Sequence, residues 1–202
     1  MNYLNFIDEF TLNFFENNKE VTIKDIHTGK KRDFSKEQVD EKLRAFYKEM
    51  DGFRLKWNVN DDNPDNYGSI NILKTKDAFT DGVDLVYFDH TPANAPLRSF
   101  YIIDFFVDEA CVGIYVGQPS LLGMHYFEFE NSTRPLHVDF EGYMKLLGAT
   151  KGFLYWQKVI LDHLSGSESF ETKSFKEVMP VISPNFHYDQ FTELYESLRI
   201  DK

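Results

Sequence analysis

Apolar residues near the start of the chain repeat with helical spacing. Leu4, Ile7, Phe10 and Phe14 lie three or four positions apart, which predicts an N-terminal helix. The segment after it, residues 17–34, alternates apolar and polar positions around a Thr-Gly-Lys step. This pattern favours a short β-hairpin.

A second helix is predicted over residues 36–50, where the apolar side chains form one stripe. Ser35 and Gln38 have the spacing of a capping box, in which each side chain satisfies a free backbone amide at the helix start. Gly52 suits the left-handed conformation that closes a helix, so we expect it to have a positive φ angle.

Strict alternation of apolar and polar residues follows this helix. Phe53, Leu55, Trp57 and Val59 alternate with polar residues and predict a half-buried strand. Similar apolar runs predict further strands at residues 69–73, 100–107, 111–117 and 124–129. A segment between them, residues 83–87, is ambiguous between a turn and a strand.

Helical spacing returns in the last third of the chain. A helix capped by Asp139 is predicted over residues 140–147, and Gly148 is expected to interrupt it. Residues 151–163 are apolar almost all round and predict a buried helix. An amphipathic segment, residues 188–199, predicts the last helix.

The order of these elements indicates an α+β fold, with a mainly antiparallel sheet flanked by N-terminal and C-terminal helices. The 202 residues are enough to bury one core, so we expect a single domain over residues 1–202. Trp57 and Trp156 lie on apolar patterns and are expected to be buried.

The composition adds a strongly acidic surface. The formal net charge is −11 and the sequence pI is about 5.0. Such a surface repels phosphate backbones, which argues against nucleic-acid binding, and attracts a basic partner. Acidity that serves only solubility remains an alternative. Aromatic residues make up 16% of the chain, enough to fill a core with rings and to leave some on a binding surface.

The sequence also favours a reducing, cytoplasmic location. Cys111 is the one cysteine, so no disulfide forms within the chain. Asp8 and Glu9 stand where a signal peptide would be apolar, and no apolar run has the length of a membrane helix.

No catalytic or metal-binding motif stands out, and no cofactor is predicted. The six histidines are scattered, although His125 and His137 flank a predicted turn and give a weak metal signal. Cys111 lies in an apolar strand, where a buried hydrophobe is the commoner role. Carboxylates in or beside strands keep a carboxylate-dependent enzyme open as an alternative; they are Asp84, Asp89, Asp104, Asp108 and Glu109.

The stretch "KLRAFYKEMDGFRLKW" resembles a helix and Asp-Gly junction of the SUKH superfamily, also called the Smi/Knr family. The matching positions are Leu43, Phe46, Tyr47, Met50, Asp51 and Gly52. "GSINIL", "FYIIDFFVDEACVGIYVG" and "VDFEGYMKLLGATKGFLYWQ" resemble its later strands and helices. The resemblance covers about residues 35–161, and residues 166–202 are expected to form a helical C-terminal extension.

This resemblance implies a non-enzymatic domain that binds proteins. Bacterial members of the family are commonly immunity proteins that neutralise polymorphic or secreted toxins, and fungal members regulate cell-wall synthesis. A cytoplasmic immunity protein with a basic toxin as its partner, such as a nuclease, is therefore expected. A regulatory adaptor of the cell-wall type is the alternative.

The partner is expected to dock on acidic loops with aromatic anchors at the centre of the contact. The predicted partner-binding residues are Asp61, Asp62, Asp65, Tyr67, Phe79, Asp81, Asp84 and Asp89. Rim charges mainly speed association, so binding should slow as the salt concentration rises. Loops that are only solvated are the alternative.

Overall fold

The computed structural model describes residues 1–15, 18–30, 39–61, 63–64, 66–128 and 132–201. In this part of the chain seven antiparallel strands form one sheet, and their order in space is their order in the sequence. The strands are β1 (Val21–Thr28), β2 (Phe53–Val59), β3 (Tyr67–Ile72), β4 (Phe100–Val107), β5 (Ala110–Tyr115), β6 (His125–Glu128) and β7 (Arg134–Pro135).

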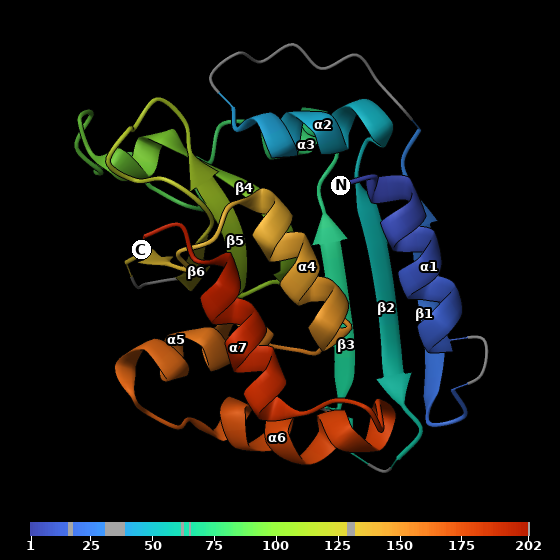
Figure 1. Cartoon of the computed structure of the whole chain (residues 1–202). Helices are drawn as coiled ribbons and strands as arrows, with labels where there is room; N and C mark the ends of the chain where they lie inside the picture. The colour runs from blue at the N-terminus through green and yellow to red at the C-terminus, as the bar shows by residue number, and fades with distance from the viewer. Residues whose placement is uncertain (16–17, 31–38, 62, 65, 129–131, 202) are drawn as a thin grey trace.

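Helices cover one face of this sheet, which makes the fold α+β, as predicted (Figure 1). The helices are α1 (Tyr3–Phe15), α2 (Glu41–Glu49), α3 (Thr75–Ala78), the 3₁₀ helix η1 (Pro96–Ser99), α4 (Phe140–Thr150), α5 (Trp156–Ser165), α6 (Phe170–Ile182) and α7 (Tyr188–Leu198). Helix α1 lies beside β1 and β2, while α4 and α7 cross the middle of the sheet (Figure 1).

Alternation along β2 explains which face of the sheet is buried. Phe53, Leu55, Trp57 and Val59 point into the core, and the residues between them are more exposed. Trp57 lies opposite Gly68 of β3, where an added Cβ would come within 2.1 Å of the indole ring. Gly68 therefore makes room for a ring that is fully buried, as predicted.

The five strands predicted from alternation are confirmed, with ends shifted by a few residues. Strand β1 pairs with β2 from Val21, opposite Val59, to Thr28, opposite Phe53. The second strand of the hairpin predicted within residues 17–34 would fall on residues 31–34, which lie outside the described residues. The sequence pattern of a strand does not reveal its partner. Residues 83–87 form no strand in the sheet.

Helix α2 begins later than predicted. Asp40 caps it, since its Oδ1 accepts hydrogen bonds from the backbone N–H groups of Lys42 (2.9 Å) and Leu43 (3.2 Å). The prediction of a helix through residues 39–40 is wrong because aspartate caps a helix as well as serine does. Ser35 and Gln38 lie outside the described residues. The positive φ of Gly52 is confirmed, at 91°.

The boundary between α4 and α5 also differs from the prediction. Helix α4 runs through Gly148, which lies so close to Phe6 that an added Cβ would be 2.5 Å from its ring. The glycine therefore serves packing and does not interrupt the helix. Lys151, Gly152 and Tyr155 have positive φ angles, so residues 151–155 form a turn and α5 starts at Trp156.

The C-terminal segment packs into the main core. Helix α6 lies within residues 166–202, which were expected to be helical, although its own bounds were not predicted, and α7 confirms the last predicted helix. The main core cluster contains Phe175 and Met179 of α6, Tyr195 of α7, and Trp156 of α5, which is buried as predicted. A smaller cluster lies on the opposite face of β4–β6 and includes Val86, Tyr87, Phe100, Ile102, Cys111 and Phe127.

Candidate functional site

The segment between α3 and η1 brings three predicted acidic residues onto one loop. Asp81, Asp84 and Asp89 are all exposed. Between them, Val83, Leu85 and Phe88 are 41%, 40% and 50% exposed. We refer to residues 81–89 as the acidic–apolar loop. Exposed apolar side chains set among carboxylates are a common feature of protein-binding surfaces.

Two side chains hold this loop against the fold. Tyr87 is buried in the smaller core cluster and its hydroxyl donates to Asp81, a bond that raises the pKa of the Tyr87 phenol. Arg98 lies over the Tyr87 ring at 4.6 Å and donates to the carbonyl oxygen of Thr91 at 2.7 Å.

Backbone bonds close the tip of the loop. The N–H of Val86 donates to the carbonyl oxygen of Gly82 (2.7 Å), and the N–H of Asp84 donates to that of Tyr87 (2.8 Å). Asp84 has a φ of 64°, in the left-handed region that aspartate adopts more readily than most other residues in turns. The loop is therefore a fixed structure.

The other predicted acidic loop lies at the opposite end of β3. Asp61 precedes β3, whereas the acidic–apolar loop follows it, and six strand residues span about 20 Å. Asp61 accepts hydrogen bonds from the backbone of Asn63 (3.1 Å) and the side chain of Asn66 (2.8 Å), which shape its own turn. Asp62 and Asp65 lie outside the described residues.

The two predicted aromatic anchors also lie apart. Tyr67 is half-buried at the start of β3 and lines a hollow of about 290 Å³ with Tyr155 and Phe170. Phe79 is half-buried, and its ring packs 6.0 Å from Tyr47 and 5.6 Å from Tyr101. It faces the core, so the exposed ring of Phe88 and the aliphatic side chains of the acidic–apolar loop are better placed as anchors.

The carboxylates of the enzyme alternative do not converge. Asp104 is 1% exposed on β4, where it accepts hydrogen bonds from Tyr143 Oη (2.6 Å) and the backbone N–H of Asn71 (2.9 Å). Asp108 and Glu109 are exposed in the turn after β4, and Tyr155 donates to Glu109. A carboxylate sealed inside the core cannot contact a substrate together with two on the surface.

Cys111 and His125 are both buried and reach no open site on the described surface. Cys111 is fully buried, and burial raises the pKa of its thiol. His125 is 3% exposed, and burial lowers the pKa of its ring. Among the described residues, no three His, Cys, Asp or Glu side chains lie close enough to hold a metal ion. None of the helices the structure describes combines the length and apolarity that crossing a bilayer needs.

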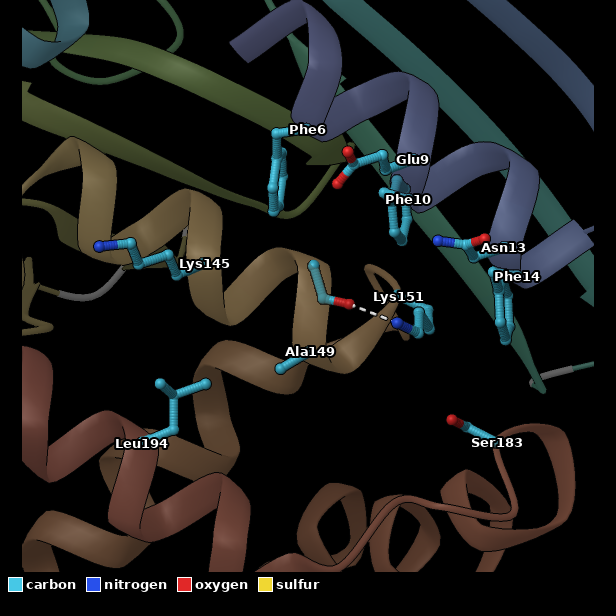
Figure 2. A pocket seen from close by; sticks show the side chains of 11 residues that line it. Phe6, Glu9, Phe10, Asn13, Phe14, Lys145, Ala149, Lys151, Ser183 and Leu194 are labelled. Atoms are coloured by element: carbon cyan, nitrogen blue, oxygen red, sulfur yellow. Dashed lines mark hydrogen bonds between the residues drawn. The ribbon is translucent and has the colours of Figure 1, made fainter. Parts of the chain in front are cut away.

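A second surface feature, which sequence reasoning missed, is a hollow of about 480 Å³ between α1 and α4 (Figure 2). It continues into a second hollow of about 360 Å³ towards the start of α7, and the two share Ala149, Lys151, Ser183 and Leu194. We call the combined feature the α1–α4 groove. The sequence pointed to none of these residues as functional, because Lys151 and Gly152 were placed at the start of the helix predicted over residues 151–163.

Comparison of the chain with protein-family models, with curated proteins and with solved structures finds no match. The SUKH resemblance therefore stays a prediction from the sequence. What the geometry offers is a fixed loop that exposes acidic and apolar groups, and a groove with a lysine at its centre.

Proposed function

We propose that the protein is a non-enzymatic binding protein of the immunity type, which neutralises a basic partner such as a secreted toxin by docking through the acidic–apolar loop. The observation that carries this proposal is the combination on one loop of exposed Val83, Leu85 and Phe88 with exposed Asp84 and Asp89. Apolar groups give a contact its affinity, and the surrounding charges select a basic partner.

The fixed shape of the loop supports this role. Tyr87 and Arg98 tie the loop to the smaller core cluster, so little conformational entropy is lost when a partner binds. Phe88 is half exposed and stacks on His90 with ring centroids 5.7 Å apart, which orients the ring before any partner arrives. A preorganised aromatic group is a typical centre for an interface.

The charge of the molecule supports a basic partner. With a formal net charge of −11, the protein attracts a positively charged surface over a distance set by the salt concentration. The partner's approach should therefore be fast at low salt and slower at high salt. The immunity role itself rests on the SUKH resemblance described above.

The first prediction tests this interface with a partner captured from the native cell by pull-down. The double variant Asp84→Lys, Asp89→Lys should slow association at low salt by about tenfold or more, because rim charges act mainly on the association rate. Asp81 is left intact because it holds Tyr87. Phe88→Ala should instead speed dissociation, and both rates are measured by surface plasmon resonance.

The matched control is Glu177→Lys, Glu193→Lys, which changes the net charge by the same amount at two exposed residues on α6 and α7. If both double variants slow association equally, the slowing comes from the change in net charge and not from the position of the loop. Unchanged rates for the loop variants would place the interface elsewhere on the surface.

A further inference from the structure

The α1–α4 groove carries an inference that is independent of the acidic–apolar loop. The rings of Phe6, Phe10 and Phe14 line its α1 side, and Ala149 and Leu194 line the opposite side. Lys151 lies between these walls, with its amino group between Phe10 and Phe14 on one side and Ser183 on the other (Figure 2). The two walls thus offer apolar side chains to either side of the Lys151 cation.

The two lysines of the groove differ in their partners. Lys145 forms an ion pair with Glu141 at 2.7 Å. Lys151 has no carboxylate within ion-pair distance among the described residues, and its Nζ donates one hydrogen bond, to the carbonyl oxygen of Gly148 (2.8 Å). An ammonium group has three donors, so two remain for a ligand.

The ammonium group of Lys151 is partly removed from water, and no carboxylate in the described part of the chain pairs with it. Its Nζ lies 5.5 Å and 5.6 Å from the ring centres of Phe10 and Phe14, and burial lowers the pKa of the amine. The ring faces attract the ammonium group, but these cation–π contacts replace only part of the hydration that a half-buried cation loses. Binding an anion there would restore the lost interaction.

We propose that the α1–α4 groove binds a small carboxylic acid with an apolar body, whose carboxylate pairs with Lys151 and whose body packs on the phenylalanine rings. Its size lies in the usual range of small-molecule sites, about 300–1,000 Å³. The carboxylate of Glu9 also lines the groove, so one unpaired lysine suits a single negative charge and disfavours a doubly charged phosphate.

Lys151 also has a purely structural explanation. It follows the last residue of α4, and a lysine that donates to a carbonyl of the last turn stabilises the end of a helix. The two roles predict opposite changes when the charge is removed. A helix cap lowers the melting temperature when it is lost, whereas an unpaired buried charge in a binding site leaves it unchanged or raises it.

The test uses 4-phenylbutyrate and its neutral amide as probes, with amide chemical shifts at Gly148 and Ser183 as the readout. The wild type should bind the acid about tenfold or more tightly than the amide, since a charged hydrogen bond distinguishes them. Lys151→Met should remove this preference without lowering the melting temperature. Glu9→Gln should tighten binding of the acid alone.

Lys145→Met is the matched control, because it removes a charge from the same groove at a lysine already paired with Glu141. It should retain the preference for the acid. Equal binding of acid and amide by the wild type, or no binding of the acid at millimolar concentration, would overturn the proposal. A Lys151→Met variant with a lower melting temperature and an unchanged preference would assign Lys151 to the helix cap alone.

Discussion

Burial governs the chemistry of Asp104. Removal from water raises the pKa of this carboxyl to about 6, and the hydrogen bonds from Tyr143 and Asn71 offset only part of that rise. In the unfolded chain the pKa of an aspartate is about 3.9. The folded state therefore holds this proton more tightly, so the stability it contributes is present below about pH 4 and is lost as the pH rises through about 6.

A comparison with Asp104→Asn should reveal this dependence. The free energy of unfolding of the wild type, minus that of the variant, should fall by about 2 kcal/mol between pH 4 and pH 7, because only the wild type ionises at this position. In the Asp104→Asn variant the new side-chain amide needs an acceptor. Gln157 Oε1, which has no hydrogen-bond partner among the described residues and lies beside Tyr143, can supply it. Urea denaturation at each pH measures the difference, and a constant or rising difference would contradict the expectation.

At the scale of elements, Gly52 sets the turn from α2 into β2. Its φ is 91°, and a Cβ there would lie 2.9 Å from the carbonyl oxygen of Ile72. Gly166, at the end of α5, also has a positive φ, of 66°, but has no atom within 4 Å of the same added Cβ. An alanine at Gly166 would therefore introduce backbone strain alone, whereas an alanine at Gly52 would introduce both strain and a steric clash.

The expected result is that Gly52→Ala costs more stability than Gly166→Ala. Backbone strain alone should cost about 1 kcal/mol at either site, and the contact with the β3 backbone should add 1 kcal/mol or more at Gly52, both being order-of-magnitude values. Chemical denaturation of the two variants beside the wild type gives the comparison. Equal losses would mean that the β3 backbone moves aside freely.

Elements with a regular pattern could be predicted from the sequence, and those shaped by tertiary contacts could not. Strand β2 follows from the alternation of Phe53 to Val59 alone. The turn before α5 depends on Trp57, whose Nε1 donates to the carbonyl oxygen of Lys151 at 2.8 Å, and no local pattern marks that contact. Helix α6 lies in the segment expected to be helical, but no regular pattern marked its ends, and it contains Pro180.

The candidate sites show the same division. The acidity of residues 81–89 is visible in the sequence, but their separation from Asp61 by the length of β3 is not. Lys151 gave no signal of function, because its isolation from carboxylates follows from the packing of α1 against α4. Charge and hydropathy can be read from a short stretch of sequence, whereas the lack of a paired carboxylate at Lys151 among the residues described depends on how the whole chain folds.

At the scale of the whole molecule, Phe175 links the C-terminal helices to the rest of the core. Its ring is fully buried and lies 5.9 Å from Phe153, 5.2 Å from Phe186 and 5.4 Å from Phe191. Phe153 in turn lies 6.4 Å from Trp57 of β2. These contacts run from α7 to the sheet without a break.

Phe175→Ala should therefore destabilise the whole protein by about 3–5 kcal/mol, through lost burial and the cavity left behind. Phe170→Ala is the control on the same helix; that side chain is 77% exposed, and its loss should change stability by less than about 0.5 kcal/mol. Tryptophan fluorescence and far-UV circular dichroism should report one coincident transition. Separate transitions would mean that residues 166–202 unfold as an independent unit.

The order of elements along the chain also affects synthesis. Strands β1–β7 lie between residues 21 and 135, whereas α4–α7, which cover the sheet, lie between residues 140 and 198. A ribosome therefore releases the strands while only the helices that precede α4 are available to cover them, so Ile70 and Phe106, which pack against Gly152 and Tyr155, stay open to water and to other nascent chains. Until translation is complete, this apolar face is a binding site for chaperones and a starting point for aggregation.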